Sequence, residues 1–228
     1  MGLDQPAGER PASRAVQVAE TLRQMICNND LAPGSSFLET ELGEMLGVSR
    51  TPIREAAVIL EGRGLVEIVP RRGIRIATLT ITDMEEIYDI LIELEPFAAA
   101  RAAALGHGDE ELAPVRRCLT EMEDALEQGD RARWAEWDGR FHSGLVALSG
   151  NGRLVEIVSM YSDQVHRARL LTLHMRPEPH ASNRCHRALV DAIARGAVDE
   201  ARTLHRDHRV EARSVLIELL KRHSLTRI

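Results

Sequence analysis

The chain has 228 residues and a formal net charge of −6; 44% of its residues are hydrophobic and 28% are charged. This balance excludes a wholly disordered chain and supplies enough apolar residues for one large domain or two modest ones. No apolar run approaches the roughly 20 residues that cross a bilayer, and three widely separated cysteines argue against a disulfide scaffold, so we expect a cytoplasmic protein with no membrane partner.

The first elements in chain order are three short helices and a hairpin. Apolar residues recur at helical spacing over three stretches: 15–28, 39–46 and 49–61. Gly47 suits the turn before the third helix and Ser49 suits its N-cap. Two β-prone runs follow, at 65–69 and 73–77. This order predicts a winged helix-turn-helix domain over residues 13–78, preceded by a flexible N-terminus, residues 1–12.

After residue 78 the pattern is helical throughout. Thr82-x-x-Glu85 has the form of a capping box, which predicts a long helix from there to about Leu105. Five further helices are predicted, at 109–128, 130–149, 151–175, 181–195 and 199–221. The fold class we predict is therefore mostly α: an N-terminal winged helix-turn-helix, then an all-helical bundle of six helices over residues 79–228.

Arginines gather at the start of the predicted third helix and at the tip of the hairpin. A helix N-terminus favours acidic side chains by about 0.3–1 kcal/mol each, so Arg50 and Arg54 oppose that preference. DNA phosphates or guanine edges would offset the cost. Each arginine taken alone is equally explained by solvation of an exposed helix. As a set, they predict these DNA-contacting residues: Ser49, Arg50, Thr51, Arg54, Arg71, Arg72 and Gly73.

A second group of residues has the chemistry of a metal site. Asp138 and His142 are four residues apart and share one face of a predicted helix. His186 and His208 lie in the last two predicted helices, within apolar periodicity. One carboxylate and three imidazoles suit Zn²⁺, with Ni²⁺ or Mn²⁺ as other candidates. From spacing alone, hydrogen bonding in a core explains these residues better, and His205 is an alternative to His208.

The first domain resembles the GntR family of bacterial transcription regulators. The residues that carry this resemblance are Leu31-x-Pro33-Gly34, the run from Glu41 to Ala56, Gly64-Leu65-Val66 and Arg71-Arg72-Gly73. The stretch Val48–Ala56 is the most specific. The resemblance implies that Arg50, Thr51, Arg54 and the wing tip contact operator DNA. Thr40 is a departure, because some members carry a DNA-contacting arginine there.

The segment 80–222 resembles the FCD ligand-binding domain of the FadR-type branch. The residues that carry this resemblance are Glu95, Asp138-x-x-Phe141-His142, Gly150-Asn151-x-x-Leu154, His186-x-x-Leu189-x-x-Ala192-Ile193 and Ala201-x-x-Leu204-x-x-x-His208. The resemblance implies a metal held by Asp138, His142, His186 and His208, and it favours His208 over His205. Leu91 stands where members often have an arginine able to meet a carboxylate effector. Four other arginines are therefore candidate effector contacts: Arg140, Arg167, Arg169 and Arg187.

The sequence thus predicts a homodimeric, metabolite-responsive DNA-binding regulator whose two wing domains read the half-sites of a palindromic operator in double-stranded DNA. We expect the effector, with an organic acid as one candidate, to dock over the metal and release the operator, which is the behaviour of a repressor. Two alternatives stay open. A metal-dependent hydrolytic enzyme would use the centre to activate water, although no motif supplies a general base. A direct sensor would respond to the metal itself.

Overall fold

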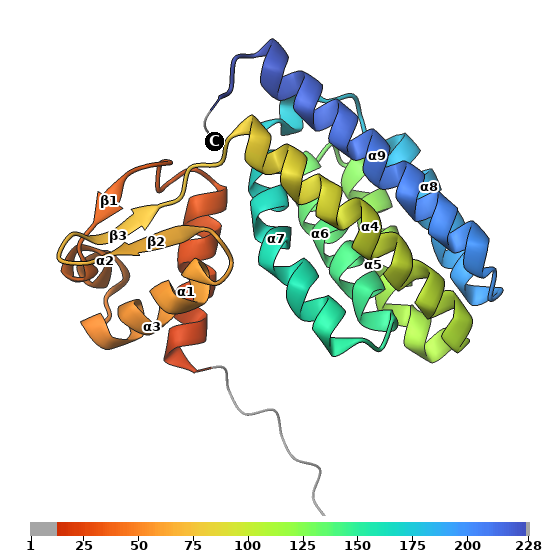
Figure 1. Ribbon diagram of the computed structural model, residues 1–228, viewed down its shortest axis with the longest axis horizontal. Helices are drawn as coiled ribbons and strands as arrows, with labels where there is room; N and C mark the ends of the chain where they lie inside the picture. Colours follow the sequence, from red (N-terminus) through yellow and green to blue (C-terminus); the bar gives the residue numbers. More distant parts are fainter. Residues whose placement is uncertain (1–12, 227–228) are drawn as a thin grey trace, which may run out of the picture.

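The computed structural model describes residues 13–226, so the predicted flexible segment 1–12 lies outside the described residues. Figure 1 shows a small body and a larger helical body side by side, joined near the top of the view. The described elements are α1 (Arg14–Cys27), β1 (Ser36–Phe37), α2 (Glu39–Leu46), α3 (Arg50–Glu61), β2 (Val66–Val69), β3 (Gly73–Ile76), α4 (Ile81–Leu105), α5 (Asp109–Glu127), α6 (Arg131–Leu148), α7 (Gly152–Leu171), η1 (Leu173–Met175), α8 (His180–Ala194) and α9 (Val198–Arg222). The mostly helical fold class and the winged helix-turn-helix are confirmed.

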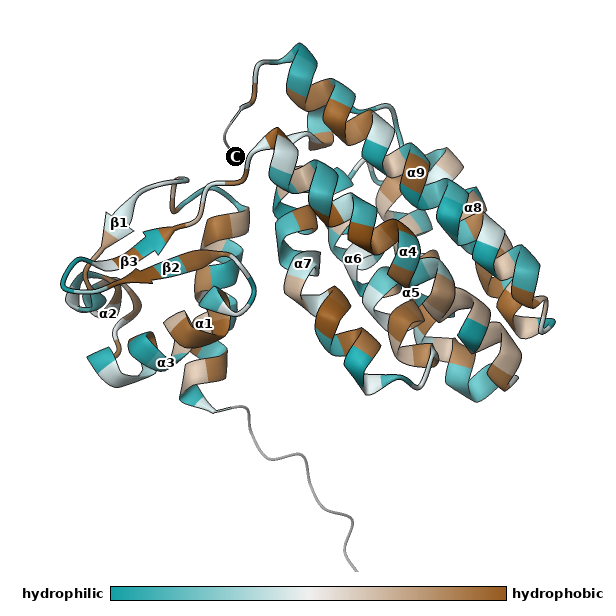
Figure 2. Ribbon diagram, viewed as in Figure 1, coloured by the Kyte–Doolittle hydropathy of each residue, from teal (hydrophilic) through white to brown (hydrophobic). Residues whose placement is uncertain are grey.

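The small domain is held together by one apolar core between its three helices and its sheet. Leu22 from α1, Ile53 and Leu60 from α3 and Ile74 from β3 are at most 3% exposed, and Figure 2 shows brown apolar segments on α1 and β2. The sheet has the order β1-β3-β2 and is antiparallel throughout. The sequence did not predict β1, because a strand of two residues leaves no alternating pattern to detect.

The larger domain consists of six helices, α4 to α9, around two apolar clusters. Phe141 and Leu189 lie at the centre of one cluster, and Met84 and Leu216 at the centre of the other; all four are fully buried. The long helices α4 and α9 run alongside each other in Figure 1. None of the described helices combines the length and the apolar character that a membrane span requires.

The start of α4 differs from the prediction. The helix begins at Ile81, and its N-cap is Thr80 rather than Thr82: the Thr80 hydroxyl accepts a hydrogen bond from the Asp83 N–H, and the Asp83 carboxylate accepts one from the Thr80 N–H. Both Thr80-x-x-Asp83 and Thr82-x-x-Glu85 satisfy the capping-box pattern. Sequence alone therefore could not choose between them.

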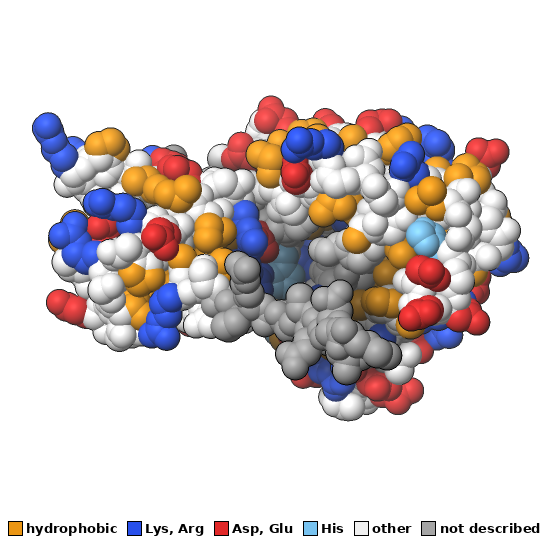
Figure 3. Space-filling view, turned by 90° about the horizontal axis from the view of Figure 1, so that it is seen from below, with side chains coloured by type: hydrophobic (Ala, Val, Ile, Leu, Met, Phe, Trp, Pro, Cys, Tyr) orange, Lys and Arg blue, Asp and Glu red, His pale blue; other side chains and the backbone are white. Residues whose placement is uncertain are grey.

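Helix α7 of the larger domain packs against the small domain. Asp163 is ion-paired with Arg23 of α1, at 3.4 Å, and with Arg63, at 3.3 Å. Gln164 donates a hydrogen bond to the Arg63 carbonyl, and Arg167 donates one to the carbonyl of Ala77, in the segment that joins the domains. Figure 3 shows the hollow that remains between the two bodies on the face seen from below.

Candidate DNA-reading helix and candidate metal centre

Helix α3 is set against α2 by two glycines. Gly47 adopts a left-handed conformation (φ 63°) that ends α2, a conformation that costs glycine little. A Cβ atom at Gly43 would lie 2.8 Å from the Val48 carbonyl oxygen, so the turn can approach α2 only because no side chain is there. The exposed Ser49 follows as the N-cap residue of α3. The first turn of α3 contains no acidic residue.

The two arginines of α3 are exposed and share one partner. The Arg50 and Arg54 side chains are 64% and 68% exposed, and Glu39 at the start of α2 binds both, at 3.0 Å and 2.9 Å. Hydrogen bonds from Arg54, and then from Arg50, hold the pKa of Glu39 below its ordinary value. Each guanidinium has five N–H donors, so donors remain for DNA. Thr51, between these arginines, is exposed as well.

The wing tip has a second group of exposed arginines. Arg71 (φ 64°) and Arg72 are exposed in the turn between β2 and β3, and basic side chains gather on this small body in Figure 3. Gly73 has φ +90°, and a Cβ atom there would lie only 2.2 Å from the Phe37 carbonyl oxygen. The glycine predicted to contact DNA is thus also required by the close approach of β1.

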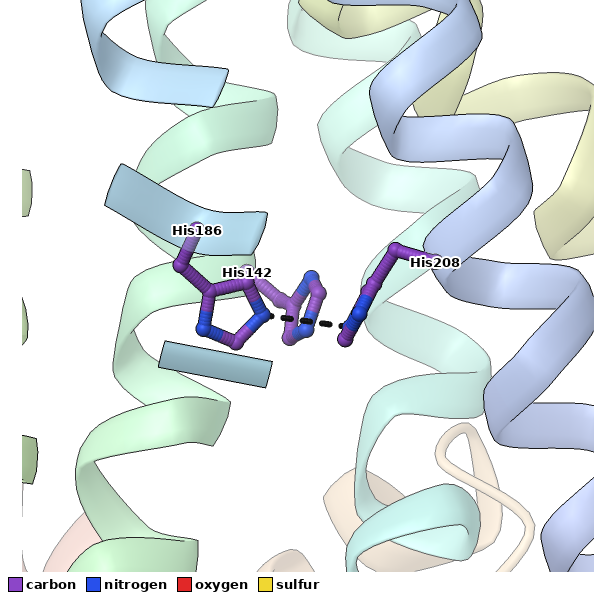
Figure 4. Close-up of side chains that lie close together, drawn as sticks. All are labelled: His142, His186 and His208. Atoms are coloured by element: carbon purple, nitrogen blue, oxygen red, sulfur yellow. Dashed lines mark hydrogen bonds between the residues drawn. The ribbon is translucent and has the colours of Figure 1, made fainter. Parts of the chain in front are cut away.

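Three histidines from three helices converge inside the larger domain, as Figure 4 shows. His142 comes from α6, His186 from α8 and His208 from α9, and one ring nitrogen from each lies within 4.8 Å of the others. Nε2 of His186 is 3.1 Å from Nε2 of His208. Asp138, one turn before His142, lies 3.7 Å from His142 and 3.8 Å from His186. The fold therefore brings the four predicted ligands together.

The cluster has the chemistry that a metal ion requires. Burial is the main cause that lowers the pKa of His142, His186 and His208 well below the ordinary range, so these imidazoles are neutral and able to ligate. Both ring nitrogens of His142 are buried without a hydrogen-bond partner among the described residues. Such atoms are uncommon in proteins unless something outside the chain satisfies them. Arg169 forms an ion pair with Asp138.

His205 faces a different partner from His208. Its Nε2 lies 2.8 Å from the carboxylate of Glu95, which also accepts hydrogen bonds from Arg209. Nδ1 of His142 is 3.3 Å from the same carboxylate. Burial raises the pKa of Glu95, but the Arg209 charge and the two histidines outweigh it and hold this pKa well below the ordinary value. Glu95, His142 and His205 form a second group with metal-like spacing.

A cavity of about 190 Å³ opens beside the histidines. Asp138, Arg169 and His208 lie in its wall together with Arg131 and Arg176, two arginines that sequence reasoning missed. Arg131 donates to the carbonyls of Leu173 and Arg176. Burial lowers the pKa of Arg176 to about 10. Neither arginine belongs to a motif; Arg176 directly follows η1, and its Nε donates a hydrogen bond to the Thr172 hydroxyl.

Three of the four arginines predicted to bind an effector lie elsewhere. Arg140 is paired with Glu136 and Arg187 with Glu123, all on the surface, and Arg167 binds the carbonyl between the domains. Arg169 alone of the four lines the cavity. Their positions in sequence did not predict which face of the helices they occupy.

A winged DNA-binding domain followed by a helical domain with a buried polar centre defines a class of protein: the ligand-responsive transcriptional regulators. Two family models match the chain, "Bacterial regulatory proteins, gntR family" over residues 14–76 and "FCD domain" over residues 86–211. The protein belongs to the GntR family, in the FadR-like branch that carries an FCD domain.

Individual relatives agree with this membership. An uncharacterized HTH-type transcriptional regulator in an unstable DNA locus of Streptomyces ambofaciens is 35% identical over 89% of this chain and 84% of its own length. The uncharacterized HTH-type regulator YdhC of Bacillus subtilis is 35% identical over 72% of this chain and 73% of its own. The solved structure of E. coli McbR/YncC superposes with a TM-score of 0.76 at 22% identity, over 90% of this chain and 98% of that one, and so supports the fold.

The comparisons decide one of the open alternatives. The relatives named above are helix-turn-helix regulators, and the chain is a DNA-binding transcriptional regulator rather than an enzyme. Hydrolysis by the buried centre is therefore set aside. The buried His/Glu groups could hold a metal ion.

Proposed function

We propose that this regulator reads its operator through the first turns of α3 and through the wing. Arg50 and Arg54 would reach base edges or phosphates, with Ser49 and Thr51 beside them. Arg71, Arg72 and Gly73 would meet the backbone or the minor groove. The observation that supports this is the pair of arginines, about two-thirds exposed, at a helix start that has no acidic residue. The protein would act in the cytoplasm as a homodimer on a palindromic site.

The metal ligands in this proposal are Asp138, His142, His186 and His208. Three neutral imidazoles and one carboxylate form a set that suits Zn²⁺ and would also accept Ni²⁺ or Mn²⁺. The unpartnered Nε2 of His142 supports the fit. The ion would supply a Lewis-acid anchor for an oxygen ligand, and Asp138 would exchange its ion pair with Arg169 for the metal.

The effector in this proposal is a small organic acid. A divalent ion and the three arginines of the cavity wall outweigh the three carboxylates there, Asp138, Glu178 and Glu211, so the cavity favours an anion. Its volume of about 190 Å³ is close to that of a cavity that holds one benzene molecule. The guanidinium groups of Arg131, Arg169 and Arg176 can each donate two parallel hydrogen bonds to the two oxygens of one carboxylate.

The first experiment measures the metal. Native mass spectrometry with elemental analysis of the purified protein should find one ion per chain. The double variant Asp138→Ala, His142→Ala should have none, with the Glu136→Ala variant as a control on the same helix. Full occupancy in the double variant would show that the ligands are others.

The second experiment measures regulation. A duplex selected by the protein from random-sequence DNA serves as the operator probe, and fluorescence anisotropy gives its affinity with and without a metabolite extract. Release of the duplex is the expected direction if the protein is a repressor; one relative, 26% identical over 83% of this chain and 84% of its own length, is named "HTH-type transcriptional repressor RspR" of Escherichia coli. Stronger binding in the extract would indicate an activator. An affinity that follows free Zn²⁺ alone would favour the metal-sensor alternative.

A further inference from the structure

Glu95 lies at the meeting point of three helices. It is 1% exposed on α4, and its carboxylate faces His142 of α6 and both His205 and Arg209 of α9. Arg209 is itself only 3% exposed and binds both carboxylate oxygens. A buried charge without a partner costs several kcal/mol, so this pair is stable only because the two groups are together.

The group Glu95, His142 and His205 has the spacing of a metal site but not its charge balance. The guanidinium of Arg209 already occupies both oxygens of Glu95 with a fixed positive charge. A metal ion there would have to displace that buried charge from Glu95. A neutral imidazole has one lone pair, so His142, whose Nδ1 faces Glu95 and whose Nε2 faces Asp138, could ligate ions in both groups only as a deprotonated, bridging imidazolate.

We propose that Glu95 is a positioning residue for the metal centre, and that Arg209 and His205 hold it in place. Nδ1 of His142 lies 3.3 Å from the Glu95 carboxylate, so a small turn of the ring would let Glu95 accept an Nδ1–H. That hydrogen bond would fix the ring in the tautomer whose lone pair is on Nε2, the nitrogen on the Asp138 side. Metal-bound histidines commonly donate their second N–H to a carboxylate in this way, and loss of that partner lowers metal affinity about 10–100-fold. The inference rests on the proposed metal site and names what orients it.

Two consecutive residues of α9 have the two roles: His208 is a proposed metal ligand, and Arg209 holds Glu95. His208 faces the metal-ligand group, whereas Arg209, the next residue along α9, faces Glu95. Neighbouring residues of a helix point about 100° apart, so one helix can supply a ligand and the support of another ligand. His205, three residues before His208, lies on the Glu95 side. A shift of α9 would thus disturb His208 directly and His142 through Glu95.

The test uses the full-length protein and Zn²⁺ alone, with affinity measured by competition against a chromophoric chelator. Glu95→Gln, which keeps the shape and removes the charge, should weaken Zn²⁺ binding about 10–100-fold. Glu93→Gln is the matched control, because Glu93 is exposed on the same helix and pairs only with Arg206 among the described residues; its affinity should equal that of the wild type.

A spectroscopic readout separates orientation from folding. In metal-free protein, ¹⁵N chemical shifts of the histidine rings should show His142 with its proton on Nδ1, and this signal should move toward a tautomer mixture in Glu95→Gln and in His205→Gln. If Glu95→Gln does not fold, His205→Gln carries the affinity test, with a smaller loss expected because Arg209 remains. Wild-type Zn²⁺ affinity and an unchanged His142 tautomer in the folded variant would overturn the proposal.

The outcomes also distinguish this inference from the proposed function. No Zn²⁺ binding by the wild type would refute the metal site itself. One ion per chain with no effect of Glu95→Gln would leave the metal site and refute the role of Glu95. Two ions per chain, falling to one in Glu95→Gln, would make the Glu95 group a second metal site and overturn the positioning role.

Discussion

The charged side chains of α3 and those around the buried histidines differ in exposure and in pairing. Arg50 and Arg54 are about two-thirds exposed and share a single carboxylate, so DNA can replace that partner at little cost. Glu95, Asp138 and Arg209 are at most 3% exposed, and each of them is paired inside the domain. Exposed ion pairs contribute about 0–1 kcal/mol, whereas breaking a buried pair costs about 3–5 kcal/mol.

This difference predicts whether a substitution changes binding alone or changes binding and folding stability together. At the exposed arginines of α3, a substitution should change DNA affinity and leave folding intact. Around the buried histidines, a substitution should change ligand binding and stability together, because the side chains that would bind the metal are also packed in the core. Variants from both regions can test this contrast.

The largest effect should come from the double variant Arg50→Ala, Arg54→Ala. Each bidentate arginine–guanine contact contributes about 1–3 kcal/mol, so loss of both should lower operator affinity at least about 30-fold, while the urea midpoint stays near that of the wild type. Fluorescence anisotropy with the selected duplex measures the first quantity. Arg153→Ala, whose side chain is 86% exposed on α7, is the control and should bind normally. An unchanged operator affinity in the double variant would mean that α3 is not the reading helix.

Phe141→Ala tests how much the packing around the buried histidines contributes to stability. Phe141 is fully buried, and its ring centroid lies 4.3 Å from that of His186. Its truncation should lower the free energy of unfolding by about 3–5 kcal/mol, as measured by urea denaturation. Phe97→Ala makes the same chemical change at a side chain that is 42% exposed and should cost less than about 1 kcal/mol. Equal costs at the two positions would contradict the assigned core.

The two regions also differ in how far sequence could predict them. The DNA-reading group lies within a few consecutive residues, where local periodicity and the turn at Gly47 define the geometry. The i,i+4 pair Asp138 and His142 is local in the same sense. The other two ligands come from separate helices, and spacing alone could not choose between His205 and His208, which lie on neighbouring faces of α9. The resemblance to the FCD domain, not the spacing, favoured His208.

The arginines that line the cavity show most clearly what the sequence could not predict. Arg140 and Arg187 are near the ligands in sequence but point to the surface. Arg131 and Arg176 carry no motif and reach the cavity only through the packing of α6 against the turn after α7. Which arginine reaches a cavity depends on tertiary packing, and no periodicity encodes it.

Gly73→Ala asks whether the wing glycine serves the fold or only DNA. At φ +90°, and with the Phe37 carbonyl 2.2 Å from a Cβ, alanine should destabilise the small domain by about 1–3 kcal/mol. Thermal unfolding followed by circular dichroism measures this. The control is Gly62→Ala, at φ −61° with no atom closer than 3.5 Å to the added Cβ, which should be neutral or slightly stabilising. A loss of DNA binding without loss of stability in Gly73→Ala would assign the glycine to DNA alone.

The smallest effect concerns Glu39, the carboxylate that holds both arginines of α3. Glu39→Gln removes a negative charge near the DNA phosphates, so affinity for random-sequence DNA should rise. The arginines also lose the partner that fixes their positions, so the ratio of operator to random-sequence affinity should fall several-fold, or about 1 kcal/mol. Glu44→Gln, which makes the same chemical change at an exposed residue of the same helix, is the control. Equal gains for both duplexes would make Glu39 only a competitor of DNA.

The pH dependence of DNA affinity gives a second test of the role of Glu39. Because Arg54 and Arg50 hold the pKa of Glu39 below its ordinary value, the carboxylate stays ionised where a free glutamate begins to protonate. The difference between wild type and Glu39→Gln should therefore persist from neutral pH through the ordinary glutamate range and close only below it. Anisotropy titrations across that range, at constant ionic strength, measure the closure. A difference that closes already within the ordinary glutamate range would mean that Arg50 and Arg54 do not hold Glu39 in solution.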